Sequence, residues 1–331
     1  MISCLLRTTM SPALLTALLL LQGAQAAAEP AQRREPRSPA TASTREALRQ
    51  LQLLRKIPVV QSSPLEVPNT MNSGKRLAVM ALVDASGRPS FFQGIFKPPL
   101  TREGASAETR QMMEQRGIPY GSDHRREAGY SLTAAYMGCL SLPSTLRRLD
   151  GQLGSLQVFA GDAESAFTRF TPHDWQPAKA KDVDLRSLLA MLVVDYVTNQ
   201  RDRHFNNILV ARANNQDHLI PIDNGIGFAP ATDQLPAFSA LYRILFSKVT
   251  GQAFSRSRES WLALMRSKTL PQLEAQDWQR IKDTDERQLA RHLRRIGLEP
   301  RVVADSIARL RLVKREGLNA LVTHPLPGIF E

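Results

Sequence analysis

The stretch Asn199 to Val210 reads NQRDRHFNNILV and is the most informative segment of this sequence. It places Asp202 and Asn207 among other polar side chains and then becomes abruptly apolar. A further acid, Asp223, follows in LIPIDNGIGF (Leu219 to Phe228). Between the two polar groups, NILVAR and HLIPI read as strands on either side of the turn sequence ANNQ, and such a pattern folds back as a hairpin. We therefore expect Asp202, Asn207 and Asp223 to come together at one site.

The spacing of these residues is typical of phosphoryl-transfer chemistry. Four residues separate Asp202 from Asn207, as in the catalytic loop of protein kinases, where the Asp receives the proton of the acceptor and the Asn holds Mg²⁺. A carboxylate at Asp223 can bridge a metal to nucleotide phosphates, and hard oxygen ligands suit Mg²⁺ or Mn²⁺. Taken singly, each residue has a simpler interpretation, such as a surface ion pair of Asp202 with Arg203 or an ordinary turn residue. Their combination around one hairpin favours the functional interpretation.

Five motifs, taken together, resemble the phosphatidylinositol 3-/4-kinase-like branch of the kinase superfamily. DRHFNN is similar to the D-R-H-x-x-N loop of this branch, which includes HipA-type toxin kinases and secreted Golgi kinases that modify proteins and xylose. DNGIGF resembles the metal-binding segment of the Golgi kinases. Upstream, GIFKP, RREAGYSLTAAYMG and GSLQVF follow in the order of the family's ATP-binding strand, its paired helix and the strand that enters the adenine-binding hinge. The similarity covers residues 76–228.

This resemblance implies a nucleotide site with ATP as the cofactor. Lys97 of GIFKP would bind the α- and β-phosphates and would be held by Glu127 of the following helix. The backbone of Gln157, Val158 and Phe159 would contact the adenine ring. The N-lobe therefore supplies the expected nucleotide-binding residues.

The resemblance also implies the residues of the transfer step. Asn207 and Asp223 would hold Mg²⁺ or Mn²⁺, and Asp202 would orient the acceptor hydroxyl and take its proton. His204 would assist with that proton or contact the γ-phosphate, and a purely structural hydrogen bond is the alternative for this residue. Because such catalysis is positioning plus electrostatics, loss of Asp223 is expected to be more damaging than loss of His204.

The sequence departs from the family pattern in places. Many relatives have Asn two residues before the Asp of D-R-H, where this chain has Gln200, with Asn199 displaced by one position. The Golgi kinases rely on disulfides, which this chain is not expected to make. NSGKR (Asn72 to Arg76) lacks the first glycine of a Walker A loop and its Ser or Thr after Lys75, so we reject that motif. The same segment remains a candidate for the loop that covers ATP.

The order of the motifs predicts an α+β, two-lobed protein-kinase-like fold, with a β-rich N-lobe and a mainly helical C-lobe. We expect a cleft between the lobes, where ligands commonly bind. The predicted divisions are a signal peptide (1–26), a disordered linker (27–44), the N-lobe (45–160) and the C-lobe with the catalytic loop and a helical tail (161–331).

Local patterns predict the individual elements. Residues 43–56 form a helix with a Ser43–Glu46 capping box, and residues 100–123 are polar and irregular. The other expected elements are strands at 76–83 and 90–97, a helix at 124–140, two strands around Asp150-Gly151, an amphipathic helix at 182–198 and a basic amphipathic helix at 300–322.

The N-terminus has the features of an export signal. Arg7 precedes an apolar run from Ala13 to Leu21, and Ala24-Gln25-Ala26 is an A-x-A cleavage pattern. We expect a periplasmic or secreted protein, with an uncleaved membrane anchor as the alternative. Cleavage would remove Cys4 and leave Cys139 as the only thiol, where a buried small hydrophobic residue is expected.

Composition leaves several partners open. The formal net charge of +12 over 331 residues favours acidic partners. The expected partners are ATP and a hydroxyl-bearing acceptor, with protein Ser/Thr slightly favoured over an inositol lipid or a sugar. A catalytically silent nucleotide-binding pseudokinase and a basic surface-binding protein are the competing hypotheses. Nucleic acid is not an expected partner, whereas peripheral contact with an anionic membrane stays open.

Overall fold

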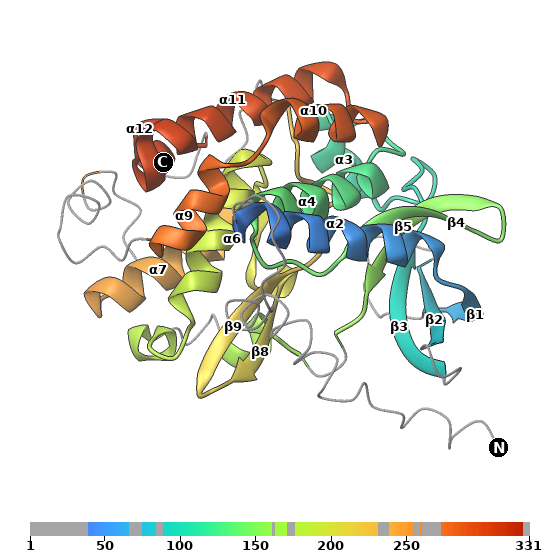
Figure 1. Ribbon diagram of the computed structural model, residues 1–331, viewed down its shortest axis with the longest axis horizontal. Coiled ribbons are helices and arrows are strands. Elements are labelled where there is room, and N and C mark those ends of the chain that lie inside the picture. The colour runs from blue at the N-terminus through green and yellow to red at the C-terminus, as the bar shows by residue number, and fades with distance from the viewer. Residues whose placement is uncertain are drawn as a thin grey trace, which may run out of the picture.

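The structure, a computed structural model, describes residues 39–65, 75–83, 89–160, 163–170, 176–230, 238–253, 259 and 273–326. The predicted signal peptide, residues 1–26, and residues 27–38 of the predicted linker lie outside the described residues. Figure 1 shows a five-stranded sheet at one side of the molecule and most of the helices at the other. This arrangement confirms the predicted α+β fold with a β-rich N-lobe and a mainly helical C-lobe.

The N-lobe is built on one antiparallel sheet with the strand order β1-β2-β3-β5-β4. Its strands are β1 Val59–Pro64, β2 Arg76–Val83, β3 Pro89–Lys97, β4 Ser144–Leu149 and β5 Gln152–Val158. Both hairpins predicted in this lobe are present, β2 with β3 and β4 with β5. Asp150 and Gly151 join β4 to β5 with φ angles of 50° and 79°. Positive φ at both central residues is the geometry of a tight two-residue hairpin turn.

Helix α2 (Pro39–Lys56) packs on this sheet and on helix α4 (Asp123–Met137). Leu54 and Ile57 are buried in one cluster with Met80 and Phe96 of the sheet. Removing this apolar area from water is the main stabilising contribution of α2 to the N-lobe.

The predicted start of α2 is wrong. The helix already runs from Pro39, so Ser43 lies inside it and the last residues of the predicted linker are helical. Glu46 pairs with Arg49 one turn later, with 2.7 Å between Oε2 and Nε, instead of capping a helix end. Packing against the rest of the N-lobe, and not the local cap pattern, sets where this helix begins.

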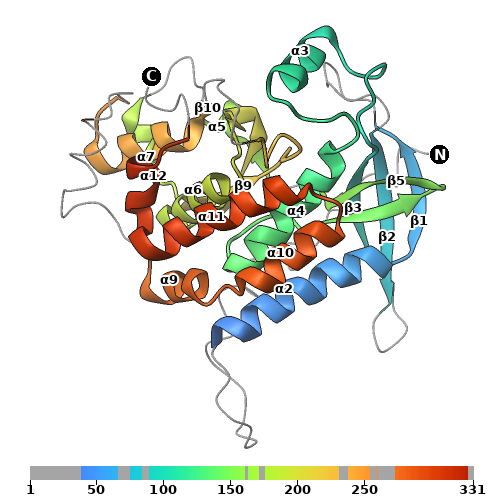
Figure 2. The same cartoon turned by 90° about the horizontal axis from the view of Figure 1, so that it is seen from above.

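Helix α4 (Asp123–Met137), predicted from the sequence, lies between the two lobes. Figure 2 shows it between the sheet and α6 (Leu185–Val197), with α2 along one side. Most of its side chains are buried, and it ends at Gly138, whose φ of 67° is the left-handed conformation of a helix C-terminus. Because both lobes pack on α4, this helix fixes how the N-lobe sits on the C-lobe.

The prediction that residues 100–123 are irregular is wrong, because helix α3 (Ala107–Gln115) lies within them. The Ser106 hydroxyl caps it by accepting a hydrogen bond from the Thr109 N–H at 3.2 Å. Met113 and Ile118 are buried, whereas most other side chains of the segment are exposed. The helix depends on its cap and on a few long-range apolar contacts, so it leaves little periodic signal in the sequence.

The C-lobe surrounds α6, which was predicted to be amphipathic. Every residue from Ser187 to Val197 is buried, so α6 is covered on all sides and has no solvent face. The remaining elements are β6 Glu164–Ser165, α5 Ala166–Phe170, η2 Pro177–Ala180, β7 Asp202–Arg203, η3 Phe205–Asn207, β8 Ile208–Ala213, β9 Gln216–Pro221, β10 Phe238–Ser239, α7 Ala240–Thr250, α9 Ala275–Lys282, α10 Glu286–Arg295, α11 Pro300–Glu316, η4 Gly317–Asn319 and α12 Ala320–Thr323.

A second, smaller sheet lies in the C-lobe with the strand order β6-β8-β9. Strands β8 and β9 are the hairpin predicted from NILVAR and HLIPI, with Ile208 opposite Pro221. Asn214 and Asn215 form its turn with φ angles of 52° and 61°. The segments before β8 and after β9 consequently emerge at the same end of the hairpin.

Three further sequence-based expectations have clear outcomes. The C-terminal helix ends at Glu316, before the end predicted at residue 322, because Gly317 adopts a φ of 66° and α12 starts a new direction. Cys139 is buried as expected, and burial raises the pKa of its thiol to about 12. Within the part of the chain that the structure describes, no helix is both long and apolar enough to cross a membrane.

Candidate active site

The β8–β9 hairpin brings the three candidate catalytic and metal-binding residues to one place. Asp202 and Asn207 precede β8 in β7 and η3, and Asp223 follows β9. The Ile222 N–H donates to the Asn207 carbonyl at 3.1 Å, which closes the hairpin at its base. Asp223 has a φ of 53°, so the chain turns sharply at this residue and leaves the direction of the strand.

Lys97, at the end of β3, connects the N-lobe to this hairpin. Its Nζ lies 3.2 Å from Glu127 Oε2 on α4 and 3.3 Å from Asp223 Oδ1. Burial alone would lower the pKa of Lys97, but the two carboxylates outweigh it and raise this pKa above its ordinary value. The lysine is therefore charged and oriented at the boundary between the lobes.

Asp223 is a charged group at the solvent-exposed edge of the boundary between the lobes. Its side chain is 52% exposed, so it is open to a ligand although it is paired with Lys97. The positive charge of Lys97 lowers the pKa of Asp223 to about 2, with a smaller contribution from Lys75. Lys75 is the described end of NSGKR, the segment proposed to cover ATP, and residues 66–74 before it lie outside the described residues.

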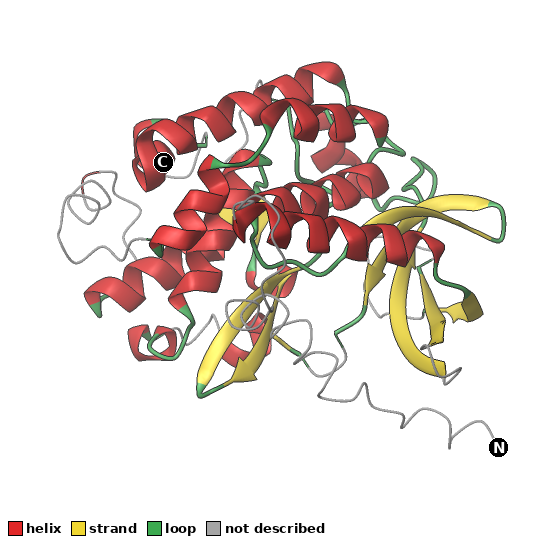
Figure 3. Ribbon diagram, in the orientation of Figure 1, coloured by secondary structure: helices red, strands yellow, loops and turns green. Residues whose placement is uncertain are grey.

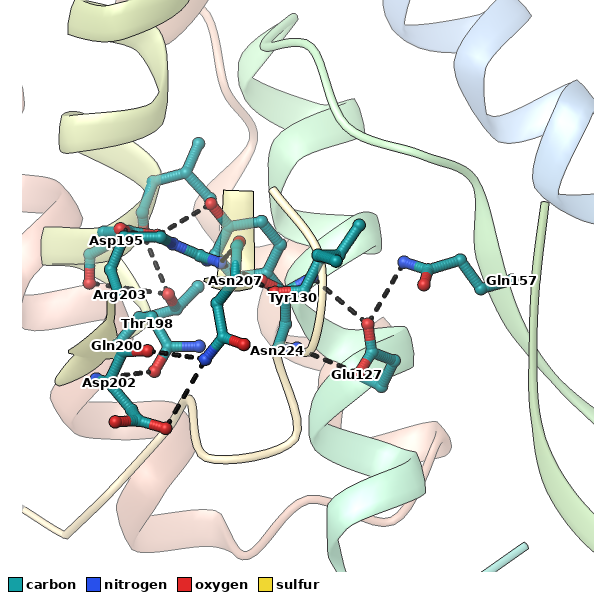
Figure 4. A network of polar contacts seen from close by, with 12 residues as sticks. Glu127, Tyr130, Gln157, Asp195, Thr198, Gln200, Asp202, Arg203, Asn207 and Asn224 are labelled. Atoms are coloured by element: carbon teal, nitrogen blue, oxygen red, sulfur yellow. Dashed lines mark hydrogen bonds and ion pairs between the residues drawn. The ribbon is translucent and has the colours of Figure 1, made fainter. Parts of the chain in front are cut away.

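Glu127 is the centre of a buried polar cluster in the N-lobe (Figure 4). Besides Lys97, its carboxylate accepts hydrogen bonds from the backbone N–H of Asn224 at 2.9 Å and from the Asn224 amide nitrogen at 3.2 Å. Gln157 Nε2 donates to the same carboxylate at 3.2 Å. Asn224, the residue after Asp223, is thus hydrogen-bonded directly to α4, the helix whose Glu127 pairs with Lys97.

Arg203 is fully buried and joins the catalytic loop to the segment around Asp223. Its Nη1 donates to the carbonyls of Asn207 and Ile222 at 2.7 and 2.8 Å, and its Nη2 donates to Asn224 Oδ1 at 2.5 Å. The guanidinium also pairs with Asp195 of α6, so the surface ion pair considered for Asp202 and Arg203 is wrong. Neither Arg203 nor Asp195 was predicted from the sequence to have a role in the site.

Asp202 is held by contacts on both sides. Its backbone N–H donates to Gln200 Oε1 at 3.1 Å, and its carbonyl accepts a hydrogen bond from Asn207 Nδ2 at 2.8 Å. Burial raises the pKa of Asp202, and the charges of His204 and Arg116 oppose this increase. His204 Nε2 is 3.9 Å from Asp202 Oδ2, too far for a hydrogen bond between the two side chains.

The donor chemistry of Asn207 and Asp223 fits a magnesium-type ion. The amide nitrogen of Asn207 is committed to Asp202, and Figure 4 shows the amide oxygen turned away from it. The described residues contain no cluster of three or more His, Cys, Asp or Glu that would make an all-protein metal cage. Mg²⁺ commonly takes only one or two protein oxygens and completes its shell with water and phosphates. An amide oxygen and a half-exposed carboxylate satisfy that requirement.

The predicted hinge has a mixed outcome. The side chain of Gln157 points to Glu127, a contact that the sequence did not indicate. The backbone N–H groups of Val158 and Phe159 donate to the carbonyls of Pro143 and Gln93 at 3.0 and 2.9 Å. An adenine ring would consequently have to use carbonyl oxygens of this segment or N–H groups beyond it. Adenine binding by residues 157–159 stays a prediction.

Comparisons with known proteins agree with the class expected from the sequence. Residues 147–250, which include the catalytic loop and Asp223, match the family described as phosphatidylinositol 3- and 4-kinase. No curated protein sequence gives a significant match.

Two solved structures match this chain with low sequence identity and low TM-scores. The proinflammatory kinase CtkA of Helicobacter pylori has 12% sequence identity and a TM-score of 0.37, with 82% of this chain and 97% of that chain covered. HipA of Shewanella oneidensis MR-1, solved with HipB and operator DNA, has 10% identity and a TM-score of 0.29, with 96% and 81% covered.

The family match and the paired Lys97, Glu127 and Asp223 define the class of protein as a kinase. The matched segment is that of the phosphatidylinositol 3-/4-kinase-like branch, as the catalytic motifs predict. Phosphoryl transfer is the general chemistry of this class.

Proposed function

We propose that this protein is an ATP-dependent phosphotransferase that moves the γ-phosphate of ATP to a hydroxyl group, with protein Ser/Thr as the favoured acceptor. The observation that carries the proposal is the position of Lys97, within 3.3 Å of both Glu127 and Asp223. Kinases require this lysine–glutamate pair and a metal-binding Asp to be in place together. Here all three groups lie together without any rearrangement of the chain.

The residues have separate tasks in the proposed reaction. Lys97 binds the α- and β-phosphates, and Glu127 keeps its ammonium group in place. Asn207 and Asp223 hold Mg²⁺ or Mn²⁺, which when bound neutralises charge on the phosphates. Asp202 orients the acceptor hydroxyl and takes its proton, and its partly exposed carboxylate, 27% accessible, leaves room for an acceptor to approach.

Fewer observations support the choice of acceptor than support phosphoryl transfer itself. A protein hydroxyl, an inositol headgroup and a sugar hydroxyl present the same attacking oxygen, so the groups around Asp202 accommodate each of them. The match to the phosphatidylinositol kinase family favours an inositol lipid as the second candidate. We further propose export through the N-terminal signal, which places the enzyme and its ATP source outside the cytoplasm, and peripheral contact with anionic membranes as an accessory property.

The test is mass spectrometry of the purified protein after incubation with ATP and Mg²⁺ or Mn²⁺, followed by the same assay with casein, phosphatidylinositol vesicles and xylosides. Transfer to the protein itself or to casein supports the protein-kinase assignment. Exclusive modification of vesicle lipid or sugar moves the assignment to those acceptors. Asp223→Ala should abolish transfer, whereas Asp283→Ala, at an exposed position beyond α9, should retain it.

A second measurement distinguishes an active kinase from a catalytically silent nucleotide-binding protein. Calorimetric titration with ATP and Mg²⁺ reports binding without turnover. Tight binding combined with no transfer to any acceptor would favour the pseudokinase, and no binding at all would contradict the nucleotide site itself.

A further inference from the structure

The DNGIGF segment, residues 223–228, carries the proposed metal-binding carboxylate and has left-handed backbone at both ends. Asp223 has a φ of 53°, and Phe228 has a φ of 58°. Residues other than glycine rarely occupy this region, and a bulky side chain remains in it only where surrounding contacts hold the backbone. The position of Asp223 therefore depends on the contacts that fix this segment.

Helix α4 contacts the DNGIGF segment at its beginning and at its end. At the beginning, the Glu127 carboxylate accepts hydrogen bonds from the backbone and the side chain of Asn224 at 2.9 and 3.2 Å (Figure 4). At the end, Phe228 is buried against Gly129, where an added Cβ would lie 3.0 Å from Phe228 Cε2. The segment consequently lies along α4 between these two contacts.

Arg126, the neighbour of Glu127 on α4, binds the end of the segment. Its side chain is almost completely buried, with 1% exposed. Its Nη1 donates to the Gly227 carbonyl at 2.9 Å and also to the Phe228 carbonyl, and its Nε donates to Ser122 Oγ at 3.0 Å. Two consecutive side chains of one helix thus hold the two ends of the segment that carries Asp223.

The surroundings of Arg126 show which of its contacts matter most. Glu299 Oε1 lies 3.8 Å from Arg126 Nη2, beyond hydrogen-bond distance, and the Glu299 side chain is 47% exposed. An ion pair of this kind contributes little. A buried guanidinium is costly unless its donors are used, and the two carbonyls of the segment use them. The hydrogen bonds to the DNGIGF segment are therefore the main interactions of this charge.

We propose that Arg126 is a positioning residue that sets the metal affinity of the site by holding the DNGIGF segment against α4. This inference rests on the proposed function, in which Asp223 provides a metal ligand. Arg126 acts through the carbonyl groups four and five residues after Asp223, and it needs no contact with metal or nucleotide. Loss of Arg126 lets the backbone leave its left-handed conformation, so the Asp223 carboxylate shifts. Lys97 keeps its pair with Glu127, so the phosphate contact is retained.

The test compares Arg126→Met, which keeps the length but removes the donors, and Arg126→Lys with the wild type. The first measurement is the affinity for Mn²⁺ in the presence of ADP, by calorimetric titration, beside the affinity for ADP without metal. We expect Arg126→Met to weaken Mn²⁺ binding about tenfold or more and to leave metal-free ADP binding unchanged. The second is hydrogen–deuterium exchange of residues 222–230, which should become faster. Arg126→Lys should recover part of both effects, because lysine cannot donate in all of the fixed directions of arginine.

The matched control is Arg125→Met, because Arg125 is the adjacent residue of α4 and its Nη1 donates to the Gly297 carbonyl at 3.2 Å, outside the DNGIGF segment. It should leave both affinities and the exchange of residues 222–230 unchanged. A purely structural role of Arg126 would weaken metal-free ADP and Mn²⁺ binding equally and speed exchange throughout the protein, and that result overturns the inference.

Wild-type Mn²⁺ affinity in a folded Arg126→Met or Arg126→Lys protein also overturns the inference, so a failure of Arg126→Met to fold leaves Arg126→Lys to decide. If the wild type binds no Mn²⁺ in the presence of ADP, the proposed function fails together with this inference. Normal wild-type binding confines a failure to Arg126.

Discussion

Arg203 and Asp195 form a bidentate ion pair that is removed from solvent, with both Nε–Oδ2 and Nη2–Oδ1 at 3.0 Å. Tyr130 of α4 donates its hydroxyl to the same carboxylate at 2.8 Å (Figure 4). Because Arg203 also binds carbonyl groups on both sides of the β8–β9 hairpin, this pair fixes the catalytic loop to α6 and to α4. The position of Asp202 therefore depends on a charge pair in the core of the C-lobe.

We expect Arg203→Lys to destabilise the protein by about 3 kcal/mol or more, although the charge is retained. Lysine cannot donate in several fixed directions at once, so Asp195 and the two carbonyls lose partners in a buried environment. Chemical unfolding in urea measures the change. Arg212→Lys is the control, because Arg212 is 46% exposed while it pairs with Asp217, and a change below about 1 kcal/mol is expected there. Equal effects of the two substitutions would contradict the role given to Arg203.

The local part of the site could be predicted from the sequence. The Asp202–Asn207 spacing, the hairpin and Asp223 are contained within a short stretch, and strand patterns with turn residues determine how such a stretch folds. Lys97 and Glu127 are farther away, and their family-like motifs identified them. The structure places all five groups around the same boundary between the lobes.

The rest of the site depends on contacts between residues far apart in the chain. Glu127 is 30 residues from Gln157 and 97 residues from Asn224 in the chain, although its carboxylate contacts both side chains. Asp195 did leave a signal, because it is an acid inside the apolar run MLVVDYV. A carboxylate buried in such a helix needs a cationic partner, and the nearby Arg203 was the available candidate.

Gln200 provides a second test, since it stands where many relatives are expected to have Asn. Its Oε1 accepts the Asp202 N–H at 3.1 Å, so it helps to set the backbone of the proposed base. We expect Gln200→Met, which keeps the length but removes the acceptor, to reduce the transfer rate about tenfold or more without changing the affinity for ATP. Gln216→Met, at the exposed start of β9, should leave the rate unchanged. A rate equal to wild type for Gln200→Met would mean that the catalytic loop holds Asp202 without this contact.

The pair formed by His218 and Asp184 predicts a pH dependence of stability. The hydrogen bond to Asp184 raises the pKa of His218, with the two side chains 3.3 Å apart. Burial would raise the pKa of Asp184, but hydrogen bonds from His218 and from the Ser187 N–H lower it to about 2. The histidine contribution is complete below its ordinary pKa of about 6.5 and is lost as the pH rises through the raised value. The aspartate contribution is complete above about pH 4 and is lost as the pH falls toward 2.

His218→Gln should consequently reduce the free energy of unfolding at pH 5.5 by up to about 1 kcal/mol, and by less at pH 9. Urea unfolding at the two pH values measures the difference. His324→Gln is the control, because it removes an exposed histidine near Glu316. It should change the free energy of unfolding at pH 5.5 by only about 0.3 kcal/mol. A larger loss for His218→Gln at pH 9 than at pH 5.5 would reverse the expected sign.

The ranking of Asp223 above His204 follows from their surroundings. Asp223 contacts the phosphate-binding lysine and provides a carboxylate oxygen at the mouth of the site, whereas His204 makes no hydrogen bond to the Asp202 side chain. We expect Asp223→Ala to reduce the transfer rate by about a thousandfold or more and His204→Ala by about tenfold to a hundredfold.

Single-turnover transfer from labelled ATP measures both rates, with Mn²⁺ affinity measured in parallel. Asp223→Ala should also lose Mn²⁺ affinity in the presence of ADP, and His204→Ala should keep it. An Asp223→Ala protein that is as active as His204→Ala would contradict the placement of the metal at Asp223, because loss of a metal ligand should reduce the transfer rate more than loss of His204.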